Sequence, residues 1–186
     1  MTQIPEAIAL EIAVLASGDR ARKGQAYERL LAATAEKVDW GAEAWPALLP
    51  FLTDADNHVR SIAGQVLSRL VLSVPVEVLL DDFGKIIAVT HDEKFVTARH
   101  VLQSSWRIGL CGPKARDLLI DTYNKRFAAA AHEKNGSLVR FDIIVAIRHL
   151  REATDDAGLD AIAERLISAE TDLKYRKKFM AAWRRG

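Results

Sequence analysis

A short helical pattern recurs along this chain at intervals of about 36 residues, and this period limits the possible folds more than any other feature. The clearest copy is DNHVRSIAGQVLSRL, in which Asp56 is followed by Arg60 and by apolar residues at helical spacing. A weaker copy, DEKFVTARHVLQSS, has Phe95 where a base is expected. The same frame places further bases at Lys23, Arg140 and Arg176. Periods of this length are typical of stacked helix pairs, so the chain is predicted to be an all-α repeat protein.

Each copy of the pattern follows another helical stretch, which makes the repeated unit a helix pair. Leading helices are predicted at about 5–16, 42–52, 76–89, 113–130 and 157–169, and second helices at about 21–36, 57–73, 93–110, 137–152 and 173–185. Short polar residues that can cap the second helices stand at Asp54, Asp56, Asp92, Ser137 and Asp172. We therefore predict a single domain over 1–186, with repeats at about 3–37, 42–74, 75–110, 112–152 and 155–186.

The segments TDADNHVRSIAGQVLSRL and SLVRFDIIVAIRHL resemble HEAT repeats, in which an aspartate closes the turn within a pair and Val-Arg opens the second helix. This resemblance covers essentially the whole chain and implies the armadillo-type fold, a right-handed α-α superhelix with its second helices along a concave face. It also implies structural contacts within or between repeats for Asp19, Asp56, Arg60, Arg140, Asp172 and Arg176. A HEAT resemblance indicates a fold much better than a function.

Charge is distributed unevenly between the two kinds of helix. The formal net charge of +1 does not indicate a nucleic-acid binder, but the leading helices are rich in acids whereas the second helices lean basic. A concave groove lined by second helices is therefore predicted to be positive, with ligand-binding candidates at Arg69, Trp106, Arg99, Arg107, Arg148 and Arg184. Such a groove suits phosphates or an acidic peptide. On an ordinary solvated face, the same arginines would instead pair with neighbouring acids or lie over apolar surface.

No catalytic template fits the chain. It contains no glycine-rich phosphate loop, no HExxH and no GxSxG, and its histidines lack the spacing of metal ligands, so no cofactor and no metal are predicted. The favoured function is a non-catalytic binding or scaffold module that holds a protein or peptide. The alternative is a nucleic-acid binder, or an enzyme like the HEAT-like alkylpurine DNA glycosylases. That likeness depends on Trp106, Trp183 and Asp142 and has no matched motif.

The ends of the chain and its one cysteine give weaker indications. The first residues have no basic segment like that of a secretory signal, and no apolar run reaches the roughly 18 residues of a membrane span. A cytoplasmic protein that does not enter a membrane is therefore expected. Cys111, the single cysteine, is expected to be an unreactive thiol that is buried or half-buried.

Overall fold

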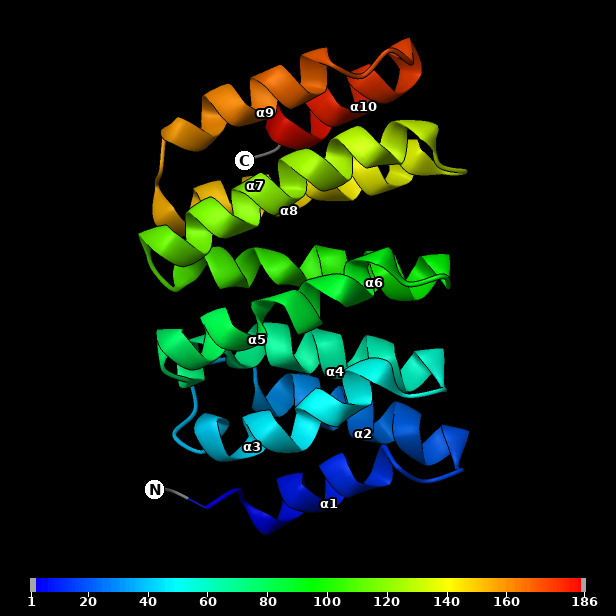
Figure 1. The fold of residues 1–186 in the computed structure, drawn as a ribbon, viewed down its shortest axis with the longest axis vertical. Coiled ribbons are helices and arrows are strands. Elements are labelled where there is room, and N and C mark those ends of the chain that lie inside the picture. Colours follow the sequence, from blue (N-terminus) through cyan, green and yellow to red (C-terminus); the bar gives the residue numbers. More distant parts are fainter. Residues whose placement is uncertain (1–2, 185–186) are drawn as a thin grey trace. The chain divides into compact units, whose positions relative to one another are not determined.

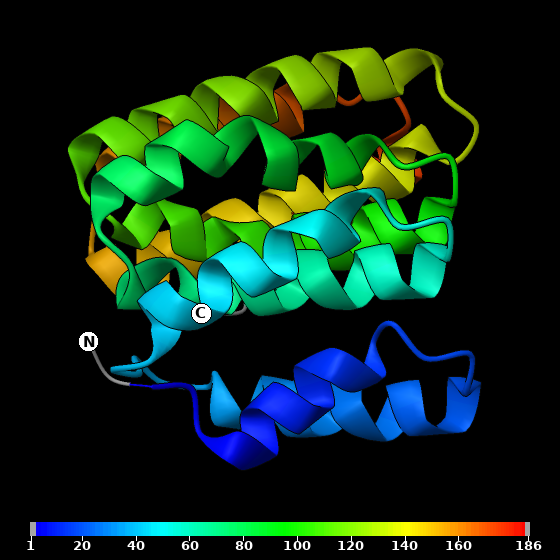
Figure 2. The ribbon, with the colours of Figure 1, turned by 60° about the horizontal axis from the view of Figure 1, so that its bottom comes forward.

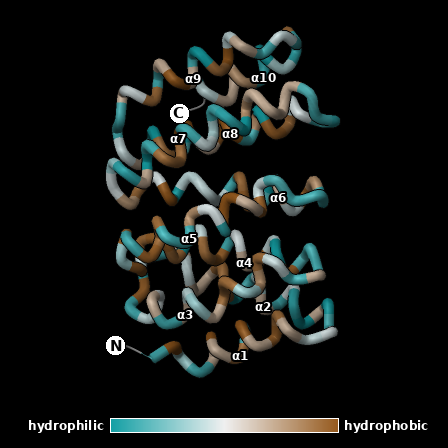
Figure 3. The backbone as a smooth tube through the Cα atoms, in the orientation of Figure 1, coloured by the Kyte–Doolittle hydropathy of each residue, from teal (hydrophilic) through white to brown (hydrophobic). Residues whose placement is uncertain are grey.

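Apolar residues spaced three or four positions apart fold this chain into helices along nearly its whole length. The computed structural model describes residues 3–184, and within this range it contains ten α-helices, five short 3₁₀ helices and no strand. Figure 3 shows that hydrophobic residues recur along every helix and are not confined to one segment. The predicted all-α class is confirmed. None of the described helices has the length and hydropathy needed to cross a membrane.

The helices pack into two units, which divide the chain between Ser104 and Ser105. The α-helices of the first unit are α1 (Glu6–Val14), α2 (Arg20–Ala33), α3 (Gly41–Leu48), α4 (Asn57–Leu70), α5 (Val76–Ala88) and α6 (Phe95–Ser104). Three of them continue into the 3₁₀ helices η1 (Leu49–Thr53), η2 (Val71–Ser73) and η3 (Val89–His91). The predicted leading and second helices of the first three repeats correspond to these elements in order.

In the first unit the second helices α2, α4 and α6 lie in a row, and each packs against the leading helix before it (Figure 1). Figure 2 shows α1 and α2 as the first such pair, joined by a short loop. Helix α4 is the centre of this unit, because every residue from Ser61 to Ser68 is buried. Gly64 allows α6 to approach α4 closely, since a Cβ there would lie 2.5 Å from Val101.

The second unit is organised around one long helix. Its elements are η4 (Ser105–Leu110), α7 (Pro113–Ala129), η5 (Ala130–His132), α8 (Gly136–Thr154), α9 (Gly158–Ser168) and α10 (Leu173–Arg184). Helix α8 packs against all of the other elements of this unit. Two buried rings, Phe127 of α7 and Phe179 of α10, meet edge to face with centroids 6.4 Å apart.

Two of the predicted helix caps are wrong. Ser137 lies inside the first turn of α8, which starts at Gly136 after Asn135 in a left-handed conformation (φ 64°). Glycine is required at that start because a Cβ on Gly136 would lie 1.6 Å from the carbonyl oxygen of Ala130. Asp54 does not cap α4; its carboxylate accepts a hydrogen bond from the backbone N–H of Asp56 in the preceding turn, at 2.8 Å.

Candidate binding surface

In the first unit, bases of the repeat frame bond to the acids that begin the next second helix. Lys23 Nζ lies 3.0 Å from Asp56 Oδ2, while Asp56 Oδ1 caps α4 by accepting from the N–H of His58 at 2.9 Å. Arg60 donates two hydrogen bonds to the carboxylate of Asp92, from Nε at 2.5 Å and from Nη2 at 2.9 Å. These bonds from Lys23 and Arg60 hold the pKa values of Asp56 and Asp92 below their ordinary range.

In the second unit the frame bases both bond to one acidic residue, Glu170, which is only 2% exposed. Arg140 Nη1 lies 3.3 Å from Glu170 Oε2, and Arg140 Nε donates to the carbonyl of Phe127 at 2.9 Å. Arg176 Nε donates to the backbone carbonyl of Glu170 at 2.7 Å. Sequence reasoning missed Glu170. A signal for it exists, because Glu170 precedes the helix-capping Asp172 by two residues, and its carboxylate accepts from the N–H of Asp172 at 3.0 Å.

The two remaining frame aspartates are helix caps. Asp19 accepts from the backbone N–H groups of Ala21 and Arg22 at the start of α2, at 2.9 and 3.1 Å. Asp172 accepts from those of Lys174 and Tyr175 at the start of α10, at 2.8 and 3.2 Å. Both acids are exposed, so their visible role is to satisfy free N–H groups at a helix start.

Two of the predicted groove arginines belong to the first unit. Arg69 Nη1 donates to the carbonyl of Leu31 at 3.3 Å, which places a positive charge near the C-terminal end of α2. The guanidinium of Arg99 lies over the ring of Phe95, 5.5 Å from its centroid. Both side chains therefore have contacts inside their own unit.

Polar side chains on the row of second helices also bond to one another across α2, α4 and α6. Tyr27 donates to Gln65 Oε1 at 3.0 Å, and Gln65 Nε2 donates to Ser61 Oγ at 3.2 Å. The Ser61 hydroxyl in turn lies 3.4 Å from His100 Nδ1. This chain of polar contacts connects α2, α4 and α6.

Three further candidates, Trp106, Arg107 and Arg148, gather in the second unit. The ring of Trp106 in η4 lies 5.6 Å from that of His149 in α8, and the guanidinium of Arg107 lies 4.6 Å from the Trp106 centroid. Arg148 lies next to His149, where it bonds to Glu152 at 2.7 Å and to the carbonyl of Ala182 at 2.9 Å. The structure thus brings the consecutive residues Trp106 and Arg107 close to His149, beside Arg148, about 40 positions further along the chain.

A second cation over aromatic rings lies along the same face of α8. Lys178 Nζ of α10 lies 4.4 Å from the centroid of Phe141 and 5.8 Å from that of Tyr175. Phe141 and Arg148 are seven positions apart on α8, about two helical turns, so they share one face. We name this region the basic–aromatic surface; it consists of Trp106, Arg107, Phe141, Arg148, His149, Tyr175 and Lys178.

The part of the chain that contains this surface is more basic than the part before it. Between Ser105 and Gly186 there are sixteen lysines and arginines against eleven acids, whereas residues up to Ser104 have ten against fourteen. Helix α10 contains five bases and no acid. The formal charges are therefore +5 for the second part of the chain and −4 for the first.

The sixth candidate, Arg184, lies elsewhere in the second unit. It lines a pocket of about 360 Å³ between α9 and α10, together with Trp183 and Met180. Neither Trp106 nor Asp142 is among the residues that line this pocket, and Asp142 is buried in α8. The acid and the two tryptophans considered for a glycosylase therefore do not share this pocket.

His149 is expected to be neutral at pH 7. Its partial burial, together with repulsion from Arg148 and Arg107, lowers its pKa below 6.5, although Glu152 opposes this shift. Replacing Glu152 by glutamine should lower the pKa further, because the nearest negative charge is removed. NMR titration of the imidazole checks this, with Lys125→Ala, a change of an exposed α7 side chain, as the control. A pKa that rises in Glu152→Gln would contradict this description.

Cys111 is half-buried, and burial raises the pKa of its thiol from 9.0 to about 11. At neutral pH this reduces the reactive thiolate about a hundredfold. We expect iodoacetamide to modify Cys111 far more slowly in the native protein than in urea, as followed by mass spectrometry. Equal rates in the two conditions would show that the thiol is not protected.

The described residues form an all-helical protein whose second unit holds cations over aromatic rings. Within residues 3–184, no cluster of three or more His, Cys, Asp or Glu side chains is placed to hold a metal ion. Comparison with protein-family models, curated proteins and solved structures finds no match.

Proposed function

We propose that this protein is a HEAT-like helical-repeat binding module, without catalytic activity, that holds an acidic segment of a partner protein on the basic–aromatic surface. The proposal includes a right-handed superhelix whose second helices form the concave side. The row of α2, α4 and α6 supports that arrangement, as do the Lys23–Asp56 and Arg60–Asp92 bonds between successive helix pairs.

The observation that carries the proposal is that cations are held over aromatic rings on the basic–aromatic surface. Arg107 lies over Trp106, and Lys178 lies between Phe141 and Tyr175. A cation over a ring face is attracted by the ring. Lys178 is also exposed, so an anion in solvent can reach it. Because such side chains are already positioned, less conformational freedom is lost when a carboxylate binds.

The same geometry favours a peptide over nucleic acid. Single-stranded nucleic acids are bound without sequence preference by stacking bases on exposed aromatic faces. Here one face of Trp106 is near Arg107 and its ring also contacts His149, while Lys178 occupies a face of Phe141. Bases would have to displace these contacts, whereas a carboxylate would bind to Lys178 in its present position.

A fluorescence anisotropy titration tests the proposal on the full chain. We expect a labelled peptide of glutamates and small residues to bind at low salt and to be released as salt is added. Lys178→Ala should weaken binding about fivefold, which corresponds to about 1 kcal/mol. Lys125→Ala is the matched control, because Lys125 is an exposed base of the same unit that bonds to Asp121 on α7.

A labelled oligothymidine of equal charge separates the two kinds of partner. Tighter binding of the oligothymidine than of the peptide, lost in Trp106→Ala, would favour the nucleic-acid alternative. No binding of either probe at low salt would remove the proposed role of this surface, and so would equal losses in Lys178→Ala and Lys125→Ala.

A further inference from the structure

The contact between Trp106 and His149 places a titratable side chain within the basic–aromatic surface. The two ring centroids lie 5.6 Å apart, with 33° between the ring planes, and the His149 side chain is still 45% exposed. Imidazole is the side-chain group whose ordinary pKa places its change of charge between pH 5 and 8. The charge of this surface can therefore change under mildly acidic conditions.

Among the described residues, three charged groups act on the His149 imidazole. On α8, Glu152 Oε2 lies 3.7 Å from His149 Nδ1, and the same carboxylate binds Arg148 at 2.7 Å. On η4, Arg107 lies over the Trp106 ring that contacts His149. Partial burial and repulsion from the two arginines outweigh the attraction of Glu152 and lower the pKa of His149. The imidazole is therefore neutral at pH 7 and becomes charged as the pH falls.

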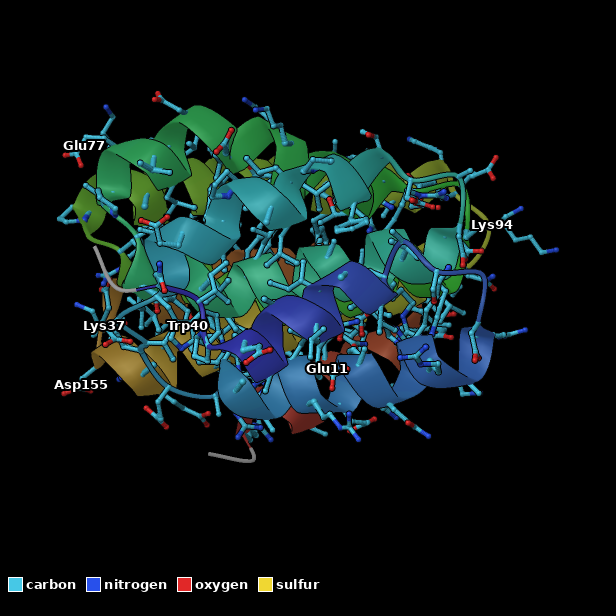
Figure 4. The ribbon with its side chains drawn as sticks, turned by 90° about the horizontal axis from the view of Figure 1, so that it is seen from below. Glu11, Lys37, Trp40, Glu77, Lys94 and Asp155 are labelled. Atoms are coloured by element: carbon cyan, nitrogen blue, oxygen red, sulfur yellow. The ribbon has the colours of Figure 1, made fainter. Side chains whose placement is uncertain are left out.

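Other groups near the end of α8 add no further charge beside the imidazole. Arg151 comes two positions after His149, so it points to nearly the opposite side of the helix, where it bonds to Asp155 at 2.8 Å. The Asp155 side chain, labelled in Figure 4, is 97% exposed and extends into solvent. Toward α10, Arg148 donates to the uncharged carbonyl of Ala182.

Protonation of His149 would add a charge that its surroundings only partly cancel. Glu152 is already bonded to Arg148, so it has to be shared between two cations. The formal charge of these three groups together with Arg107 rises from +1 to +2. The Trp106 ring attracts a cation, so the charged imidazole can stay in contact with it.

We propose that protonation of His149 strengthens the binding of an acidic segment to the basic–aromatic surface, which makes this surface a pH-sensitive binding site. This role of His149 rests on the function proposed above. A bound carboxylate favours the charged imidazole by the same free energy that the charged imidazole contributes to binding. Affinity should therefore rise as the pH falls through the lowered pKa of His149 and change little between pH 7 and 8.

Fluorescence anisotropy at pH 7.5 and at pH 5.0, at one ionic strength, tests this role on the full chain. The probe is a labelled peptide of aspartates and small residues, which stays ionised at both pH values because the ordinary aspartate pKa is about 3.9. Wild type should bind this peptide at least about threefold more tightly at the lower pH. His149→Gln should lose this difference. His132→Gln is the matched control and should keep it, because His132 is an exposed histidine of the same unit outside the surface.

NMR titration of the His149 imidazole gives a second readout of the same coupling. Saturating peptide should raise the pKa of His149, since bound carboxylates favour the charged ring. In Glu152→Gln the rise in affinity should move to lower pH, because the nearest negative charge is removed from the imidazole.

The outcomes separate this role from the proposed function. Equal affinities of wild type at the two pH values, with binding that still weakens in Lys178→Ala, would overturn the role of His149 and leave the proposed function standing. A pH dependence that persists in His149→Gln would overturn the role as well, since another group would then titrate. No binding of the peptide at either pH would remove both.

Discussion

Replacement of Arg60 by alanine is expected to lower the free energy of unfolding by about 2 to 3 kcal/mol. The substitution removes two hydrogen bonds from the carboxylate of Asp92, whose side chain is only 5% exposed. It also removes a donor from the backbone carbonyls of Asp54 and Ala55, at 2.7 and 3.1 Å. An aspartate left in this position without its cation cannot recover full hydration, and for this reason the expected loss exceeds that of a surface ion pair.

The Arg60 effect should also depend on pH. The bonds from Arg60 lower the pKa of Asp92, so the folded state binds this proton less readily than the unfolded state. The stability from the pair is present above the ordinary aspartate pKa and is lost as pH falls through the lowered pKa of the folded state. The difference between wild type and Arg60→Ala should therefore be full at pH 7 and shrink in strong acid.

Urea unfolding followed by circular dichroism measures both effects. Lys94→Ala is the control, because Lys94 pairs with Glu93 on the surface, where both side chains are more than half exposed. That variant should stay within about 0.5 kcal/mol of wild type. An unchanged urea midpoint in Arg60→Ala would mean that the Arg60–Asp92 pair contributes no net stability.

Two glycine-to-alanine substitutions in the first unit are expected to have opposite signs. A Cβ on Gly41, the first residue of α3, would lie 2.2 Å from the Cβ of Ser73 and 2.9 Å from its carbonyl oxygen. Backbone atoms cannot move away as a side chain can, so Gly41→Ala should destabilise the protein by about 3 kcal/mol. Gly24, inside α2, has no atom within 4 Å of the same position. Gly24→Ala should therefore stabilise it by up to about 1 kcal/mol, from helix propensity.

Thermal unfolding of the two glycine variants beside wild type shows the difference in one experiment. The melting temperature should fall in Gly41→Ala and rise slightly in Gly24→Ala. A rise in Gly41→Ala would show that α3 can move away from Ser73 without loss of packing, contrary to the close approach described above.

The helices of this protein could be predicted from the sequence because their signals are local. Apolar spacing and the capping aspartates Asp56 and Asp172 are read from neighbouring residues, and the observed second helices begin close to the predicted positions. The prediction that Ser137 caps α8 was wrong because the start of α8 depends on the close approach of Gly136 to the carbonyl of Ala130. Capping preferences take no account of such a contact.

The surface could be predicted only in part, because long side chains reach across helices. Arg69 and Arg148 were predicted to line a positive groove, yet each donates to a backbone carbonyl near the end of another helix, that of Leu31 or that of Ala182. The pairing of Trp106 with His149 joins residues 43 positions apart and follows from the packing of η4 on α8. Period and composition indicate which helices are basic, but not which cations lie over rings.

The double role of Asp56 couples the start of α4 to its neighbour. The same carboxylate accepts from the N–H of His58 and binds Lys23, so one side chain caps α4 and is bonded to α2. Asp92 likewise accepts from the backbone N–H of Lys94, just before α6, and from the side chain of Arg60. Fraying of such a helix end would also break the bond to the base on the neighbouring second helix. Local opening should therefore spread from one helix pair to the next as one cooperative event. Amide hydrogen exchange at the first turn of α4 should then accelerate in Lys23→Ala, although Lys23 belongs to a different helix.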